Sequence, residues 1–96
     1  MELFIFARAH ARKGREADVE HAIREVLPET AKEAGCLAVS AYRSTQDPQL
    51  FYIHSRWDSE AAFERHIDLP HTQRFVAAIE PLVDHPFKAE RMGKIA

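Results

Sequence analysis

With 96 residues, 46% of them hydrophobic, the chain has the length and composition of one small globular domain, which we take to span residues 1–96. Thirteen basic and fifteen acidic residues give a formal net charge of −2 and are interspersed, so the basic face of a nucleic-acid-binding protein is not expected. No apolar run approaches the roughly 20 residues of a transmembrane helix, and no basic segment precedes an apolar core at the N-terminus, so we expect a cytoplasmic protein without a membrane partner.

Two hydrophobic periods divide the first part of the chain into a strand and a helix. Residues 3–11 alternate between two faces and are rich in Phe and Ile, which predicts a strand. Apolar residues then recur at three- and four-residue steps over residues 15–34, which predicts an amphipathic helix. Because Pro28 lacks a backbone donor, we expect a kink near residues 24–27 or a helix in two pieces, and Gly35 supplies a left-handed stop.

The second part of the chain reads as a hairpin, two helices and a strand. Residues 37–44 and 50–57 are extended runs joined by a turn too short for a crossover, so they are expected to pair antiparallel. A polar residue at 58–59 caps the next helix, and Pro70 suits the first position of another. A final strand is predicted over residues 87–92.

This order of elements predicts an α+β fold, the ferredoxin-like split βαβ arrangement with a four-stranded antiparallel sheet. The helices would cover one face of the sheet. The other face would be left open, although alternate residues on the strands are too apolar for water on both sides. We therefore expect a homodimer in which two sheets pack face to face.

A set of short motifs is spread over nearly the whole chain. They are Glu33-Ala-Gly-Cys-Leu37, Tyr42-Arg-Ser, Asp47-Pro48, Phe51, Trp57, Glu60-Ala-Ala-Phe63, His66, Pro70-His71 and Phe75. In this combination and spacing they resemble the antibiotic biosynthesis monooxygenase family. The resemblance implies a dimeric α+β barrel, within a superfamily that includes cofactor-free quinol and polyketide monooxygenases, haem-degrading enzymes and an isomerase of a phosphorylated signalling sugar.

The chain departs from the family pattern at several places. Relatives usually have an aromatic residue where Val39 stands, a Glu where Ser55 stands and often a Tyr where His54 stands. The Glu at that place is a possible base, so its loss shifts attention to histidine. The haem-degrading branch fits poorly, because its pattern would require an Asn near Ala7, a Trp near His66 and a haem-ligating His near Val76, and all three are absent.

A cofactor-free oxygenase needs an apolar aromatic cavity, a base and hydrogen-bond donors for the developing oxyanion. Histidine suits the base because the ordinary pKa of an imidazole is about 6.5. His66 is the expected catalytic residue, since its helical spacing from Phe63 turns it toward the sheet; the plainer alternative is a partly buried histidine bonded to a backbone carbonyl. The candidate substrate contacts are Trp57, Tyr42, His71, Phe63 and His54.

No cofactor and no metal site are expected. His66 and His71 are five residues apart, which differs from the four-residue step that places two ligands on one helical face. The lone Cys36 excludes an intrachain disulfide and is expected to be a structural thiol.

The substrates expected for a monooxygenase of this kind are a small aromatic quinol or phenolic ketone together with dioxygen. Two other functions remain open. An isomerase of a small phosphorylated metabolite would need cations at the mouth of the pocket, for which Arg8, Arg43, Arg56 and Lys88 are the candidates. A dimeric small-molecule binder without catalysis would need only an apolar cavity.

Overall fold

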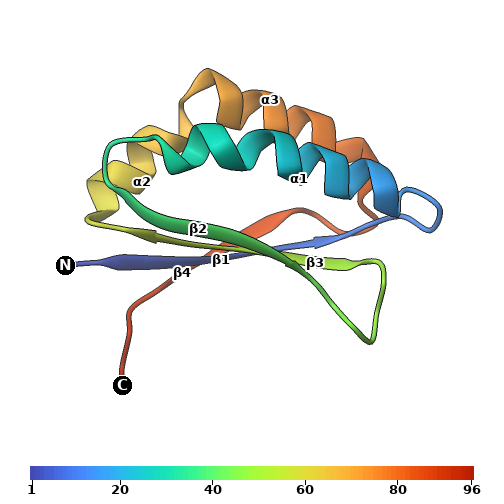
Figure 1. Cartoon of the computed structure of the whole chain (residues 1–96), viewed down its shortest axis with the longest axis horizontal. Helices are drawn as coiled ribbons and strands as arrows, with labels where there is room; N and C mark the ends of the chain where they lie inside the picture. The colour runs from blue at the N-terminus through green and yellow to red at the C-terminus, as the bar shows by residue number, and fades with distance from the viewer.

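The computed structural model describes residues 1–96 and shows two layers, with all helices packed on one face of a single sheet (Figure 1). The elements follow the predicted order, with a short 3₁₀ turn added before the last strand. None of the helices is long and apolar enough to cross a lipid bilayer. The elements are β1 (Leu3–His10), α1 (Glu16–Ala31), β2 (Cys36–Arg43), β3 (Leu50–Trp57), α2 (Glu60–Ile67), α3 (Pro70–Ile79), η1 (Glu80–Leu82) and β4 (Lys88–Met92).

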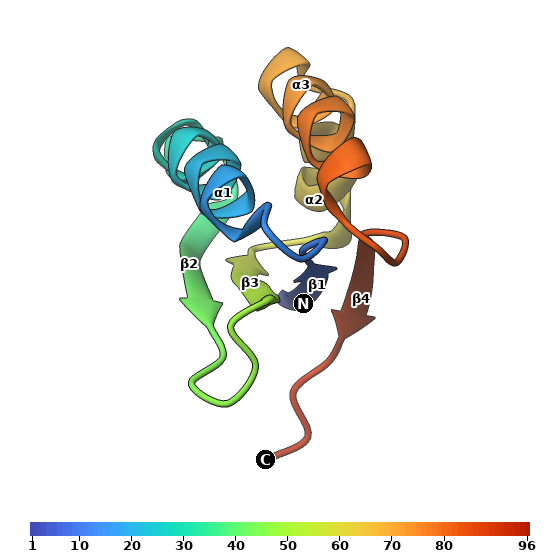
Figure 2. The same cartoon turned by 90° about the vertical axis from the view of Figure 1, so that its right-hand side faces the viewer.

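The four strands form an antiparallel sheet in the order β2-β3-β1-β4, which confirms the ferredoxin-like α+β fold. The hairpin of β2 and β3 lies beside β1, and β4 returns to the other edge of β1. Viewed along the sheet, α1 lies over the β2 side and α2 and α3 lie over the β1 and β4 side (Figure 2). The helical layer is therefore divided into two parts, one on each side of the middle strands.

The first helix differs from its predicted limits. It runs in one piece from Glu16 to Ala31 through Pro28, and it ends three residues before the expected residue 34. At its C-terminus the amide of Glu33 donates to the carbonyl of Thr30, so the chain leaves the helix in a tight turn. Of the two alternatives expected at Pro28, a kink or a helix in two pieces, the second is wrong, because the helix continues through the proline, which removes one backbone donor only.

The break between α2 and α3 follows local rules that were visible in the sequence. The Ser59 hydroxyl accepts a hydrogen bond from the amide of Ala62 at 3.2 Å and caps α2. Pro70 occupies the first turn of α3, where its missing N–H has no helical partner to lose. Both predictions are confirmed, and together they fix the place at which the two helices separate.

Two groups of buried side chains hold the helices to the sheet. The larger group joins α1, α3 and η1 to the strand ends, and the smaller group joins α2 to β1 and β3 around Trp57, which is completely buried. Burial of these apolar side chains is the main stabilising contribution to a fold of this size. The larger group contains Ala9, Ala11, Val19, Ile23, Phe51, Phe75, Ile79, Leu82 and Val83.

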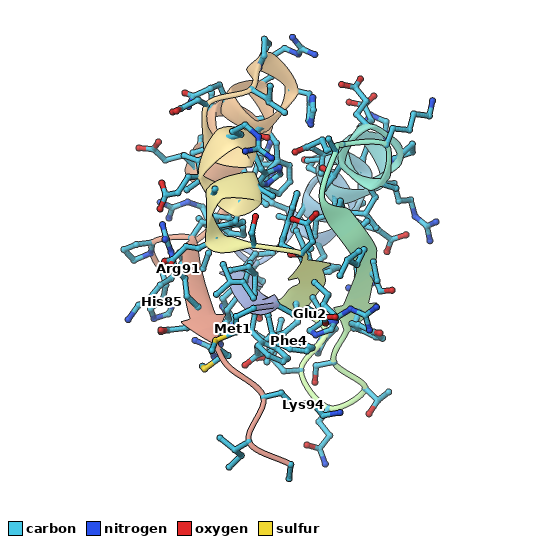
Figure 3. All side chains as sticks on the ribbon, turned by 90° about the vertical axis from the view of Figure 1, so that its left-hand side faces the viewer. Met1, Glu2, Phe4, His85, Arg91 and Lys94 are labelled. Atoms are coloured by element: carbon cyan, nitrogen blue, oxygen red, sulfur yellow. The ribbon has the colours of Figure 1, made fainter.

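The other face of the sheet carries no helix and exposes large apolar side chains. Figure 3 shows Phe4 on this side, directed away from the helical layer. Phe6 is 40% exposed, Tyr42 58% and Tyr52 39%. The strands thus present apolar side chains on both faces, as expected from their sequences.

Two glycines have left-handed backbone angles but different surroundings, which makes them a matched pair for a stability test. The φ angles are +91° at Gly14 and +89° at Gly35. A Cβ on Gly35 would lie 2.5 Å from the Cβ of Ala62 and 2.8 Å from Oδ1 of Asp58, whereas a Cβ on Gly14 would meet nothing within 4 Å. The turn that follows α1 therefore packs directly against the start of α2.

We predict that Gly14→Ala lowers the free energy of unfolding by about 1–2 kcal/mol, the cost of a left-handed alanine. Gly35→Ala should lower it by a further 1–3 kcal/mol or so, because the new methyl group also collides with α2. Urea unfolding of both variants measures the difference. Equal losses in the two variants would contradict the close packing described for Gly35.

Candidate functional site

A cavity of about 400 Å³ lies between the sheet and the two parts of the helical layer. Its size falls within the usual range for small-molecule sites. Twelve of its eighteen lining residues are hydrophobic, and its ionisable side chains are His66 and Arg91. The lining residues are Ile5, Ala7, Val26, Leu27, Thr30, Val39, Ile53, Ser55, Phe63, His66, Ile67, Thr72, Gln73, Phe75, Val76, Phe87, Ala89 and Arg91.

The imidazole of His66 lies in the wall of this cavity, and its orientation is fixed by a carboxylate on the side away from the cavity. Its Nδ1 atom is 2.8 Å and 3.0 Å from the two carboxylate oxygens of Glu33. Its ring lies between two aromatic side chains, with centroid distances of 4.8 Å to Trp57 and 5.6 Å to Phe63. The Nε2 atom makes no hydrogen bond within the protein and is not fully buried. One nitrogen of His66 is therefore fixed and the other is free to meet a ligand.

Glu33 is the buried charge of the site. Its side chain is only 7% exposed, and its hydrogen-bond donors are the imidazoles of His66 and His71, with no lysine or arginine in salt-bridge distance. Because a buried carboxylate needs donors, it fixes the positions of both rings. The same charge reaches Cys36, where burial chiefly and Glu33 secondarily raise the pKa of the thiol.

His71 lies behind Glu33, between two carboxylates. Its Nε2 atom is 2.5 Å from Oε2 of Glu33, and its Nδ1 atom is 3.3 Å from Oε2 of Glu29. Since a carboxylate only accepts, the nitrogens that face Glu33, Nε2 of His71 and Nδ1 of His66, are the donors of these hydrogen bonds.

Two of the three departures from the family pattern lie side by side in the cavity wall. Val39 and Ser55 are paired across β2 and β3, and both line the cavity. The hydroxyl of Ser55 accepts the indole N–H of Trp57 at 3.0 Å, so it serves the buried tryptophan. Trp57 itself supports the ring of His66 and does not line the cavity. This wall consequently carries no carboxylate.

The structure does not bring all of the candidate site residues together. Phe63 and His66 line the cavity, and His71 lies one layer behind them. Tyr42 and His54 lie on the open face of the sheet, where the ring of His54 is 4.7 Å from that of Phe6. A ligand in the cavity cannot touch that face, because the sheet separates the two.

The cations proposed for phosphate binding also lie elsewhere. Arg8, Arg43, Arg56 and Lys88 do not line the cavity. The one cation in its wall is Arg91, whose guanidinium lies 5.2 Å from the centroid of the Phe63 ring and is paired with two glutamates of α2, Glu60 and Glu64. Figure 3 shows Arg91 beside α2. Its charge is already compensated.

Sequence reasoning missed the roles of Glu33, Ser55 and Arg91. Glu33 was part of the family motif, but the helix was predicted to continue past it. The actual turn brings its carboxylate to two histidines that lie 33 and 38 residues further along the chain. The three side chains Glu33, His66 and His71 also have the donor set, two imidazoles and one carboxylate, that could hold a transition metal.

Comparison with known proteins identifies a family profile and solved structures that are similar to this chain. The sequence profile described as antibiotic biosynthesis monooxygenase matches residues 3–78. PA3566 from Pseudomonas aeruginosa is 29% identical with a TM-score of 0.91, over 99% of this chain and 95% of that one. Rv0793 from Mycobacterium tuberculosis is 19% identical with a TM-score of 0.94, over 100% and 97%. A crystal structure described as antibiotic biosynthesis monooxygenase is 23% identical with a TM-score of 0.91, over 98% and 99%. No functionally curated protein matches the sequence significantly.

We predict that Glu33→Gln releases His66 from its fixed tautomer. The amide leaves the two imidazoles short of acceptors, so nitrogen NMR of the imidazole rings should show a mixture of the Nδ1–H and Nε2–H forms of His66. The free energy of unfolding should fall by about 1–3 kcal/mol, the cost of an unsatisfied buried donor.

The matched control is Glu25→Gln, which changes a similar carboxylate–imidazole pair at the surface. Glu25 and His21 are 70% and 72% exposed, so this change should cost at most about 1 kcal/mol and leave His66 unaffected. A single Nδ1–H tautomer of His66 in the Glu33→Gln protein would contradict the assignment.

Proposed function

Because the chain belongs to the antibiotic biosynthesis monooxygenase family, we propose that it is a cofactor-independent monooxygenase that oxidises a small aromatic quinol or phenolic ketone with dioxygen. The family match and the structural neighbours support a general monooxygenase-like role. The observation that carries the finer proposal is the free Nε2 atom of His66 in an apolar cavity, with Nδ1 held by a buried carboxylate.

His66 is the proposed general base. Its Nε2 atom takes a proton from the substrate, and Glu33 stabilises the imidazolium that forms, as a carboxylate does in other base–orienter pairs. The substrate anion is delocalised and passes one electron to dioxygen. Recombination forms a carbon–oxygen bond, and the peroxide takes protons from His66 and from the substrate carbon. One oxygen atom remains in the ketone or quinone product and the other leaves as water.

The apolar lining suits this chemistry and the aromatic substrate that it requires. Phe63 and Phe75 contribute aromatic side chains to the lining, and Thr72 and Gln73 add polar atoms to the wall. The ionisable side chains of the wall are His66 and Arg91, and Arg91 is already paired with two glutamates. Nε2 of His66 is therefore the proton acceptor that a bound phenol would meet. Val39 and Ser55 leave room where relatives carry larger side chains.

The two alternative functions have less support. An isomerase acting on a phosphorylated metabolite lacks a free cation, since Arg91 is paired with two glutamates. A passive binder would not need an unbonded imidazole nitrogen braced by a buried carboxylate. The enzyme therefore explains more of the site than either alternative.

We further propose a homodimer formed through the open sheet faces, located in the cytoplasm. The exposed aromatic side chains of this face form the kind of apolar surface that marks interaction sites. A lone thiol at Cys36 is compatible with a reducing compartment.

We predict that the chelator-treated protein consumes dioxygen with anthrones or hydroquinones, one O₂ per product. His66→Ala should lower kcat/KM by roughly 10²–10⁴-fold, the usual contribution of a general base. An oxygen electrode with product analysis measures both values. The control is His21→Ala on the exposed side of α1, which should act like wild type. Absence of turnover above buffer across a broad panel of substrates, or wild-type rates in His66→Ala, would contradict the proposal.

For the dimer, we predict that Phe6→Glu yields monomers in sedimentation velocity, because a charge would be buried in an apolar interface. Ala77→Glu adds the same charge on the exposed side of α3 and should leave the dimer intact. A monomeric wild-type protein would overturn this proposal without affecting the reaction.

A further inference from the structure

A second cluster of imidazoles and carboxylates lies at the opposite end of the sheet from the Glu33 turn. His10 is the last residue of β1, and Asp84 and His85 follow η1 in the loop that leads to β4. Asp47 joins them from the turn between β2 and β3. The cluster therefore gathers residues from three separate parts of the chain.

Three of these side chains converge on one point. Nδ1 of His10 is 2.8 Å from Oδ1 of Asp84, and Nδ1 of His85 is 2.6 Å from the same oxygen. One ligand atom from each residue lies within 4.8 Å of the other two. The positions are set by the backbone, since the amide of Asp84 donates to the carbonyl of His10 at 3.0 Å and Ala11 forms a β-bridge with Val83.

Nε2 of His10, the nitrogen that does not face Asp84, contacts a carboxylate, as the second nitrogen of a metal-bound histidine often does. Nε2 of His10 is 2.9 Å from Oδ2 of Asp47. Asp47 is itself held, because its Oδ1 accepts the amide of Gln49 at 3.0 Å. A carboxylate behind a ligating imidazole fixes the ring and leaves its other nitrogen to the metal. This second layer is a feature independent of the three converging atoms.

Imidazoles are the ion-pair partners of both carboxylates in this cluster. No lysine or arginine lies within salt-bridge distance of Asp47 or Asp84; their partners are His10 and His85. Arg8 and Lys88 line the same surface pocket as His10 and His85, but neither forms an ion pair with Asp47 or Asp84.

We propose that His10, Asp84 and His85 bind a divalent transition metal, with Asp47 as the carboxylate behind His10. Two imidazole nitrogens and one carboxylate oxygen suit Zn²⁺, which would take water as a fourth ligand. The metal would replace the proton on Nδ1 of His10, while Nε2–H continues to donate to Asp47. Binding would therefore release protons. The site is outside the cavity and independent of the proposed reaction. Figure 3 shows His85 at the outer edge of the molecule, where an ion could reach it.

The test is titration of chelator-stripped protein with Co²⁺, followed by its visible absorption, and then displacement by Zn²⁺ in a calorimeter. We expect one ion per chain. His85→Ala should weaken binding at least about 10-fold, and Asp47→Asn by roughly 10–100-fold, the usual effect of removing an outer carboxylate. Both residues are at least partly exposed, and circular dichroism checks that the variants fold.

Two controls separate this site from others. His21→Ala removes an exposed histidine of α1 and should bind as wild type does. His71→Ala disrupts the other candidate set of ligands and should also leave binding unchanged. Absence of saturable binding in wild type, or wild-type binding by His85→Ala, would overturn the proposal. Loss of binding in His71→Ala with retention in His85→Ala would assign the ion to the Glu33 cluster instead.

Discussion

The buried carboxylate of Glu33 is the constraint on which the candidate site depends. It accepts hydrogen bonds from His66 and His71 and so ties the turn after α1 to both sides of the break between α2 and α3. A charge this deeply buried is tolerated only with its donors in place. The orientation of His66, and with it the nitrogen presented to the cavity, follows from that requirement.

The two-residue period of the strands separates two roles in space. Residues on one face of the sheet, such as Val39 and Ser55, line the cavity under the helices. Their neighbours in sequence, such as His54, point to the open face, where aromatic side chains gather. A substitution in the cavity lining therefore leaves the side chains of the proposed dimer interface in place, and the reverse also holds, because neighbouring strand residues point to opposite faces.

Much of the fold was predictable because its signals are local. The hairpin followed from two apolar runs and a turn, the break in the helices from Ser59 and Pro70, and the left-handed backbone after the first helix from Gly35. The end of α1 was the main error. Hydrophobic spacing continues to residue 34, whereas the chain turns after Ala31 through hydrogen bonds from the amides of Lys32 and Glu33.

The site was predictable only in part. His66 and Phe63 share a helix face, so their spacing placed both toward the sheet. Tyr42 and Trp57 were chosen by residue type. In the structure Tyr42 lies on the open face, and the indole N–H of Trp57 donates to the hydroxyl of Ser55. Residue type alone does not reveal whether a polar atom is already satisfied.

The sequence by itself determined the order of the elements, the α+β class, the family and the choice of a helix-borne histidine beside aromatic residues, because each depends on short-range periodicity or on a contiguous motif. Tertiary structure alone decided that Glu33 meets His66 and His71, that Ser55 meets Trp57, and that His10 meets Asp47 and Asp84. Most of these contacts join residues more than thirty positions apart. Their geometry depends on how helices and strands pack, and no local pattern of residues encodes it.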